Sequence, residues 1–257
     1  MNKILLRADD LGYSEAVNYG IEKSVKEGLI QSVGAMVNMP ATQHGVSLII
    51  NEDIAFGQHT NICVGKPISD ATQIPSMVDE KGNFKSSKEY REATSDFVVF
   101  EEALIEIEAQ YHRFLALFGK KPDYFEGHAI ASANFFKALE FFAKEHDLVY
   151  SGLPEEAEPN FLEKDASIQI NQTKVYLIME SMSKNYNPYQ TFENMLDNMH
   201  EDGVSMMIFH PGYLDAFILA NSSLLVPRTQ EVAMLIDSNV KQQIIERDIE
   251  CIDYRKL

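Results

Sequence analysis

The sequence predicts an α/β protein folded as a single distorted TIM-like (β/α) barrel. Three observations favour this fold class. Short apolar runs alternate with longer amphipathic runs along the whole chain, which is typical of a mostly parallel sheet with helical crossovers. About seven such units fit into 257 residues, which is a usual size for one barrel domain. Neither a GxGxxG nor a GxxxxGK[ST] motif is present, so the nucleotide-binding α/β folds are disfavoured.

The predicted strands are short apolar runs bounded by polar or turn-forming residues. They cover residues 3–8, 32–38, 54–59, 123–128, 174–179 and 203–210, with further candidates at 148–152 and 249–253.

The predicted helices are longer runs with apolar residues at helical spacing. The first covers residues 14–28, where Ser14 suits the N-cap and Gly28 stands just past the end. The others cover residues 42–51, 134–146, 188–200 and 228–241, together with a long helix, or two abutting ones, over about 88–118.

Two segments show no clean period. Residues 60–87 contain two Gly and two Pro, so we expect an excursion of the single domain (1–257) over the mouth of the barrel. Residues 154–172 are acidic and predicted to be irregular.

Composition excludes several classes of partner. The formal net charge is −17, with 39 acidic against 22 basic residues, which disfavours nucleic acid and anionic membranes. Cys63 and Cys251 imply neither a disulfide framework nor a CxxC metal site. No apolar run is long enough to span a bilayer, and the N-terminal run is too short for a secretory signal. We therefore expect a cytoplasmic protein.

Polar residues suited to chemistry follow four of the predicted strands. Asp9 and Asp10 follow the first strand, and His59, His128 and His210 end later ones. The carboxyl ends of parallel barrel strands ring one mouth, where active sites lie. We therefore expect these five residues to converge.

The residue types suit a metal-dependent hydrolase. Two histidines and one carboxylate make a three-ligand divalent metal site with open positions, a second Asp can act as general base, and a His can protonate a leaving group. Because side chains alternate along a strand, we expect Asp9 and Asp10 to point to opposite sides. Taken singly, the two acids could form a solvated loop that caps the next helix, and each histidine could be an ordinary loop residue.

Five stretches in this order resemble the YdjC-like carbohydrate deacetylase family, which includes chitooligosaccharide deacetylases. They are RADDLGYSEAVNYGI, GQHTNICVGKPIS, IPSMVDEKGNF, DYFEGHAI and FHPGY. The tail PRTQEVAMLIDSNVKQQI resembles the closing Arg-x-x-Glu segment of the family, with Arg228 and Glu231 at its two positions.

The resemblance implies a distorted TIM-like barrel that removes N-acetyl groups from sugars such as chitin-derived oligosaccharides. It implies one divalent metal ion, Mg²⁺ or Zn²⁺, held by Asp10, His59 and His128, with Asp9 as the catalytic base and His210 opposite it as the acid. It also implies a homodimer. Which of Asp9 and Asp10 binds the metal stays open from the sequence.

One departure from the family pattern concerns the fourth strand. The family usually has Asp-x-His-x-His there, whereas this chain has Glu126 in place of the Asp and Ile130 in place of the second His. The departure leaves the sugar open. It also leaves two alternative functions open. One is a metal-dependent hydrolase of another amide or a phosphoester, and the other is a sugar-binding protein without catalysis.

Overall fold

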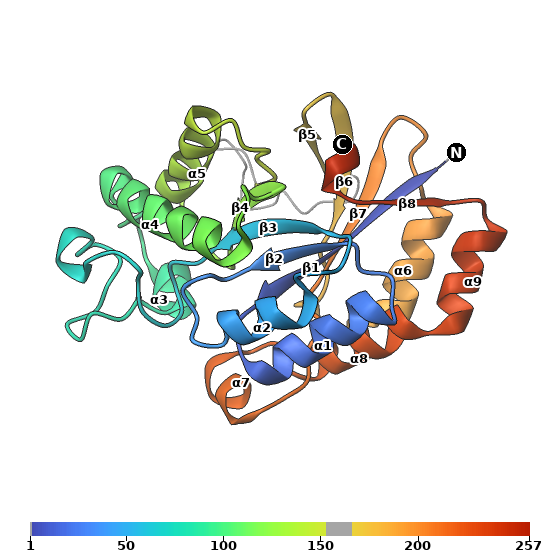
Figure 1. Cartoon of the computed structure of the whole chain (residues 1–257), viewed down its shortest axis with the longest axis horizontal. Coiled ribbons are helices and arrows are strands. Elements are labelled where there is room, and N and C mark those ends of the chain that lie inside the picture. Colours follow the sequence, from blue (N-terminus) through green and yellow to red (C-terminus); the bar gives the residue numbers. More distant parts are fainter. Residues whose placement is uncertain (1, 153–165) are drawn as a thin grey trace.

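A curled, mostly parallel sheet forms a half-barrel at the centre of the fold (Figure 1). The structure is a computed structural model that describes residues 2–152 and 166–257. The strands lie in the order β4-β3-β2-β1-β7-β6-β5, and β8 pairs with β1. Their bounds are β1 (Lys3–Leu11), β2 (Ser32–Ala35), β3 (Ala55–Thr60), β4 (Tyr124–Gly127), β5 (Ser167–Ile170), β6 (Thr173–Ile178), β7 (Val204–Phe209) and β8 (Glu250–Ile252).

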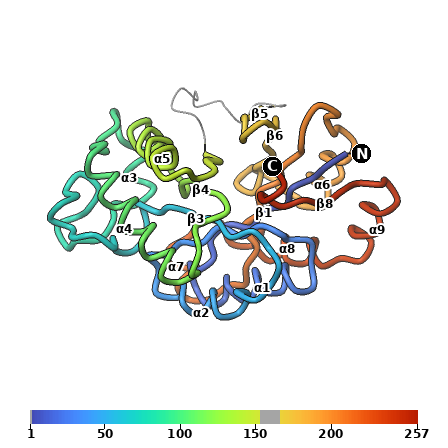
Figure 2. Tube along the Cα trace, turned by 45° about the horizontal axis from the view of Figure 1, so that its top comes forward, coloured from blue at the N-terminus to red at the C-terminus, as the bar shows by residue number. Residues whose placement is uncertain are grey.

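The first strand is the middle of the sheet. From Lys3 to Ala8, β1 pairs in parallel with β7, and its other edge pairs with β8 at its start and with β2 further along. Figure 2 shows the C-terminal segment returning beside this first strand. The sheet is not continued between β4 and β5 within the described residues. The predicted distorted barrel is therefore confirmed as a half-barrel.

Two strand predictions need correction. Residues 148–152 are not a strand, because Tyr150 makes only a single bridge to Phe125 at the edge of β4. Part of the segment 154–172, predicted to be irregular, is the strand β5, whose Ile168 and Ile170 alternate with more exposed neighbours. The hairpin to β6 turns at Asn171, which has φ 52°. Residues 153–165 lie outside the described part of the chain.

The helices lie outside the curled sheet (Figure 1). Helices α1, α2 and α8 cover one face, while α4 and α5 pack together near β4. Their bounds are α1 (Glu15–Lys26), α2 (Thr42–Ile49), α3 (Ser87–Glu92), α4 (Phe100–Phe118), α5 (Ala133–Glu145), α6 (Pro188–Asp197), α7 (Ala216–Asn221), α8 (Val226–Ile236) and α9 (Ser238–Glu246).

Local chemistry explains where the helices begin and end. Ser14 caps α1 by accepting a hydrogen bond from the N–H of Val17, as predicted. Residues 88–118, predicted as one long helix or two abutting ones, form two helices, α3 and α4, which residues 93–99 separate, and Gly119 ends α4 in a left-handed conformation. The predicted helix 228–241 is also two helices, because Asp237 is extended and caps α9. No helix within the described residues is long and apolar enough to cross a membrane.

The residues of β1 that face the interior of the half-barrel are apolar at the start of the strand and polar toward its end. Leu5 belongs to an apolar cluster inside the half-barrel, with Tyr124, Met206 and Tyr254 among its members. Arg7, two residues further along this face, donates a hydrogen bond to Tyr254. The apolar cluster therefore closes the interior at the start of the strand, and the polar groups collect toward its end.

Candidate active site

Three of the predicted site residues bring their ligand atoms together at the ends of neighbouring strands. Asp10 lies near the end of β1, His59 near the end of β3, and His128 directly after β4. Asp10 Oδ1 lies 3.2 Å from His128 Nδ1 and 3.4 Å from His59 Nε2, and these two nitrogens are 2.8 Å apart. All three residues are buried, with candidate ligand atoms within 4.8 Å of one another. One cation could contact all three.

An irregular backbone at the end of β1 turns Asp10 toward the histidines. Asp10 has φ 75°, in a left-handed region that few side chains adopt. The pairing of β1 with β2 shifts register between Ala8 and Leu11. The expectation that Asp9 and Asp10 point to opposite sides is therefore wrong. Both approach the same imidazole, since Asp9 Oδ2 lies 4.0 Å from His59 Nδ1.

Asp9 is held by a buried cation. Arg7 Nη2 donates to Asp9 Oδ2 at 2.7 Å and lies 3.5 Å from Glu126 Oε2. Asp9 Oδ1 has no hydrogen-bond partner among the described residues. A Cβ at Gly34 would lie 2.8 Å from this oxygen, so the glycine leaves it room. One oxygen of Asp9 is thus fixed by Arg7, and the other is buried without a hydrogen-bond partner among the described residues.

Glu126, where the family pattern has Asp, contacts a predicted metal ligand. Its Oε1 lies 2.5 Å from His59 Nδ1, which leaves His59 Nε2 to face Asp10. A carboxylate on the far nitrogen of a metal-binding histidine fixes its tautomer and orientation. Ile130, where the family has a histidine, is buried in the apolar cluster that contains Phe135. The altered pattern therefore leaves the Asp10 group intact.

Asp9, His59 and Glu126 form a second group with closely spaced ligand atoms. The guanidinium group of Arg7 already contacts both of its carboxylates. A divalent cation bound there would be repelled by this charge at short range. In the group around Asp10, by contrast, Arg228 contacts only Oδ2 of Asp10 and leaves Oδ1 unpaired among the described residues, so this group is the better candidate for a metal.

Neighbouring carboxylates raise the pKa values of both histidines of the Asp10 group. Burial alone lowers the pKa of His128, but the Asp10 carboxylate outweighs it and the pKa is raised to about 9. Burial also lowers the pKa of His59, yet Glu126 and Asp9 hold this pKa well above its usual value. A divalent cation at the same nitrogens would take the place of these protons.

The donor set fits a divalent metal ion. Asp10 Oδ1 is buried and has no hydrogen-bond partner among the described residues. One carboxylate and two imidazoles suit Zn²⁺, and they suit Mg²⁺ when waters complete an octahedron. Metal binding requires neutral imidazoles. The carboxylates of Asp9, Asp10 and Glu126 then outnumber the guanidinium groups of Arg7 and Arg228, so a cation would reduce the buried negative charge.

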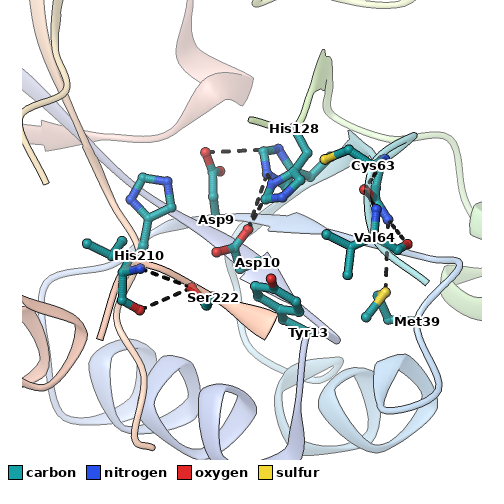
Figure 3. A network of polar contacts seen from close by, with 12 residues as sticks. Asp9, Asp10, Tyr13, Met39, Cys63, Val64, His128, His210 and Ser222 are labelled. Atoms are coloured by element: carbon teal, nitrogen blue, oxygen red, sulfur yellow. Dashed lines mark hydrogen bonds and ion pairs between the residues drawn. The ribbon is translucent and has the colours of Figure 1, made fainter. Parts of the chain in front are cut away.

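His210 lies across Asp9 and Asp10 from His128 (Figure 3). It follows β7, so the structure brings all five predicted site residues to the same end of the sheet. Burial lowers the pKa of His210 to about 4, so its imidazole is neutral at pH 7. Its ring contacts Ser181, with His210 Nδ1 3.4 Å from Ser181 Oγ.

Helix α8 connects His210 to Asp10. Arg228 Nη2 donates to Asp10 Oδ2 at 2.8 Å, and Arg228 Nη1 donates to the carbonyl of His210 at 3.2 Å. Burial alone raises the pKa of Asp10, but Arg228 and His128 lower it well below its usual range. Asp10 is therefore ionised at neutral pH and able to bind a cation.

Helix α4 holds the start of the segment 60–87. The buried Glu106 accepts hydrogen bonds from the N–H groups of Ile68 and Ser69, at 3.0 and 2.9 Å, and from the Ser69 hydroxyl at 2.6 Å. Gln110 exchanges two hydrogen bonds with the backbone of Asn61. This end of the segment is therefore fixed beside His59, and its role as a cover over the mouth stays a prediction.

Sequence reasoning missed some of the supporting residues. Arg7 stands inside the predicted strand 3–8, and a charge in a buried strand was the available signal. Ser181 follows β6 in a polar stretch that carried no signal. The Arg-x-x-Glu segment was noticed only through the family resemblance, which gave Arg228 and Glu231 no role.

The chain belongs to the YdjC-like protein family, whose family model matches residues 3–246. The expectation drawn from the five sequence stretches is thereby confirmed. Carbohydrate deacetylase 2 from Listeria innocua is 30% identical over 266 residues, covering 99% of this chain and 98% of the relative. Chitooligosaccharide deacetylase from Klebsiella pneumoniae is 26% identical, covering 98% of each chain.

Solved structures share the fold. A protein from Enterococcus faecalis V583, described as a proposed cellobiose-phosphate cleavage protein, superposes with a TM-score of 0.82 at 26% identity, covering 100% of this chain and 99% of its own. A mutant of a CE4 family pseudoenzyme superposes with a TM-score of 0.56 at 9% identity, covering 100% of this chain and 67% of its own. The second likeness concerns the fold alone.

Proposed function

We propose that this protein is a metal-dependent carbohydrate deacetylase that removes N-acetyl groups from a sugar or a chitin-type oligosaccharide. The observation that carries the proposal is the buried group of Asp10, His59 and His128, whose ligand atoms converge beside two further groups suited to proton transfer. The names of its relatives, carbohydrate deacetylase and chitooligosaccharide deacetylase, support the substrate class.

In this proposal Asp10 Oδ1, His59 Nε2 and a ring nitrogen of His128 hold one divalent ion. The ion would polarise the acetyl carbonyl and lower the pKa of the attacking water. Glu126 orients His59 for this task, and Arg228 holds the second oxygen of Asp10. Zn²⁺ and Mg²⁺ are both compatible with the ligand set.

Asp9 and His210 carry the proton. Asp9, steadied by Arg7, accepts a proton from the attacking water at its unpaired Oδ1. His210 is neutral at rest because burial lowers its pKa. It takes this proton from Asp9 and delivers it to the amine nitrogen as the C–N bond breaks. One proton passes from water to the amine nitrogen. The products are a free amino sugar and acetic acid, which releases its remaining proton to solvent and becomes acetate.

Acetate release tests the proposal. The protein is incubated with N-acetylated chito-oligosaccharides, with and without a chelator, and then with Zn²⁺ or Mg²⁺ restored. We expect acetate release that the chelator abolishes and the metal restores. Release that ignores both the chelator and Asp10→Ala would contradict the metal's role.

The same assay separates two alternatives. Hydrolysis of a phosphoester or another amide, with no acetate from the sugars, would favour a different metal-dependent hydrolase. Tight binding of an acetylated sugar with no turnover under several metals would identify a binding protein. The presence of both Asp9 and His210 argues against a binding protein without catalysis, because neither residue is required merely to bind sugar.

We also propose that the protein is a homodimer, which the family resemblance implies, and that it is cytoplasmic, which the sequence predicts. The molar mass in solution, measured by light scattering, tests the dimer.

A further inference from the structure

The histidine after β7 is held by a set of groups that the reaction scheme does not use. Glu231, one turn after Arg228 on α8, is fully buried. Its Oε2 accepts the backbone N–H of His210 at 2.6 Å. Its Oε1 accepts the Ser181 hydroxyl at 2.6 Å and the Tyr186 hydroxyl at 3.0 Å. Three donors converge on one carboxyl group, which is the pattern that suits an ionised carboxylate.

Ser181 connects this carboxylate to the imidazole. A hydroxyl has one hydrogen, and the short contact with Glu231 commits it to Oε1. The oxygen of Ser181 can then only accept from His210 Nδ1, which lies 3.4 Å away. The neutral imidazole must therefore carry its proton on Nδ1, which leaves a lone pair on Nε2, at the opposite edge of the ring.

We propose that Glu231 and Ser181 are positioning residues that fix His210 in its Nδ1–H tautomer, with Nε2 free to take up and deliver the catalytic proton. The inference rests on the proposed function, because it names how the proton carrier is prepared. Arg228 completes the arrangement by holding the carbonyl of His210 and the carboxylate of Asp10 together. Helix α8 thus sets the distance between the metal side of the site and the proton carrier.

Other groups around His210 do not make this contact. Asp9, Asp10 and His59 act on its pKa through space, from β1 and β3. Tyr186 donates to the same oxygen of Glu231 as Ser181 does. Tyr186 therefore offers a matched control, because Tyr186→Phe removes a hydrogen bond to Glu231 and leaves the link from Ser181 to the imidazole.

The test reads the tautomer directly. Full-length, Zn²⁺-loaded protein labelled with ¹⁵N-histidine is studied by NMR at about pH 8, above the pKa of about 7 to which burial raises Glu231. The His210 signal is identified by its loss in His210→Asn. We expect Nδ1–H in the wild type and in Tyr186→Phe, and a shift toward Nε2–H in Ser181→Ala. A wild-type His210 that carries its proton on Nε2 overturns the proposal without any variant.

Kinetics supply a second readout. Ser181→Ala should lower kcat at least tenfold with KM and metal content unchanged, whereas Tyr186→Phe should change kcat less than threefold. Equal kcat values for Ser181→Ala and the wild type would contradict the positioning role. If the wild type released no acetate while the tautomer result held, the proposed function would fail and the tautomer assignment would stand.

Discussion

At the scale of single residues, the geometry depends on the unusual backbone of Asp10. In a regular strand, Asp9 and Asp10 would face opposite sides of the sheet. The left-handed conformation of Asp10 brings its carboxylate to the histidines and into contact with Arg228. Asp residues tolerate this conformation better than most. The two adjacent acids therefore share one site without sharing one role.

Glu126 gives the first prediction at this scale. Because its carboxylate orients His59, Glu126→Gln should weaken metal binding by roughly ten- to a hundredfold. Competition of the protein with a metal-sensitive dye measures the affinity. Glu140→Gln, an exposed change on the neighbouring α5, is the control and should leave the affinity unchanged. Wild-type affinity in Glu126→Gln would show that the contact with His59 does not support the metal.

At the scale of elements, α8 supplies a buried acid whose ionisation opposes folding. Burial raises the pKa of Glu231 from its usual 4.5 to about 7. A raised carboxyl pKa stabilises the fold at low pH, and this contribution is lost as the pH rises from about 4.5 through about 7. The shift corresponds to about 3 kcal/mol in the free energy of unfolding.

Glu231→Gln should remove this pH dependence. Urea unfolding of chelator-treated wild type and variant, from about pH 5 to pH 8, measures it. We expect the wild type to lose stability relative to the variant as the pH rises. Parallel stability curves for the two proteins would mean that Glu231 does not titrate in this range.

Helix α4 makes a second prediction, about the segment 60–87. Glu106 accepts from both Ile68 and Ser69, so Glu106→Gln leaves one of these donors without its carboxylate oxygen. The expected cost is about 1–3 kcal/mol in the free energy of unfolding. If the segment covers the mouth, KM for the sugar should also rise.

The matched control lies two residues away on the same helix, on its exposed side. Glu108→Gln changes an exposed side chain and should leave both stability and KM as in the wild type. If Glu106→Gln is destabilised but keeps a normal KM for the sugar, the segment 60–87 takes no part in substrate binding.

At the scale of the whole molecule, the sequence predicted the fold class and the convergence of the five site residues. Strong apolar strands such as 203–210 carry their own signal, and the ends of parallel strands meet by topology. The hairpin strand β5 was not predicted, because it is short and lies within an acidic stretch. The orientation of the Asp10 side chain was not predicted, because it depends on an irregular backbone conformation that the sequence pattern does not reveal.

The contacts that prepare the site were least accessible from sequence. Ser181 and Glu231 act through distances of 2.6–3.4 Å between segments far apart in the chain, and Arg7 lies 3.5 Å from Glu126 on another strand. Local pattern carries no information about such contacts, because packing of the complete sheet and α8 creates them. The family resemblance pointed to the Arg-x-x-Glu segment, and the structure shows which atoms it holds.

The most direct test of the central claim compares Asp9→Asn and Asp10→Asn. Bound metal is counted by atomic absorption, and acetate release is measured on the same samples. We expect Asp10→Asn to lose both metal and activity, and Asp9→Asn to keep one metal ion while activity falls by about 10²–10⁴-fold. An Asp10→Asn protein that keeps its metal, or an Asp9→Asn protein that loses it, would contradict the account.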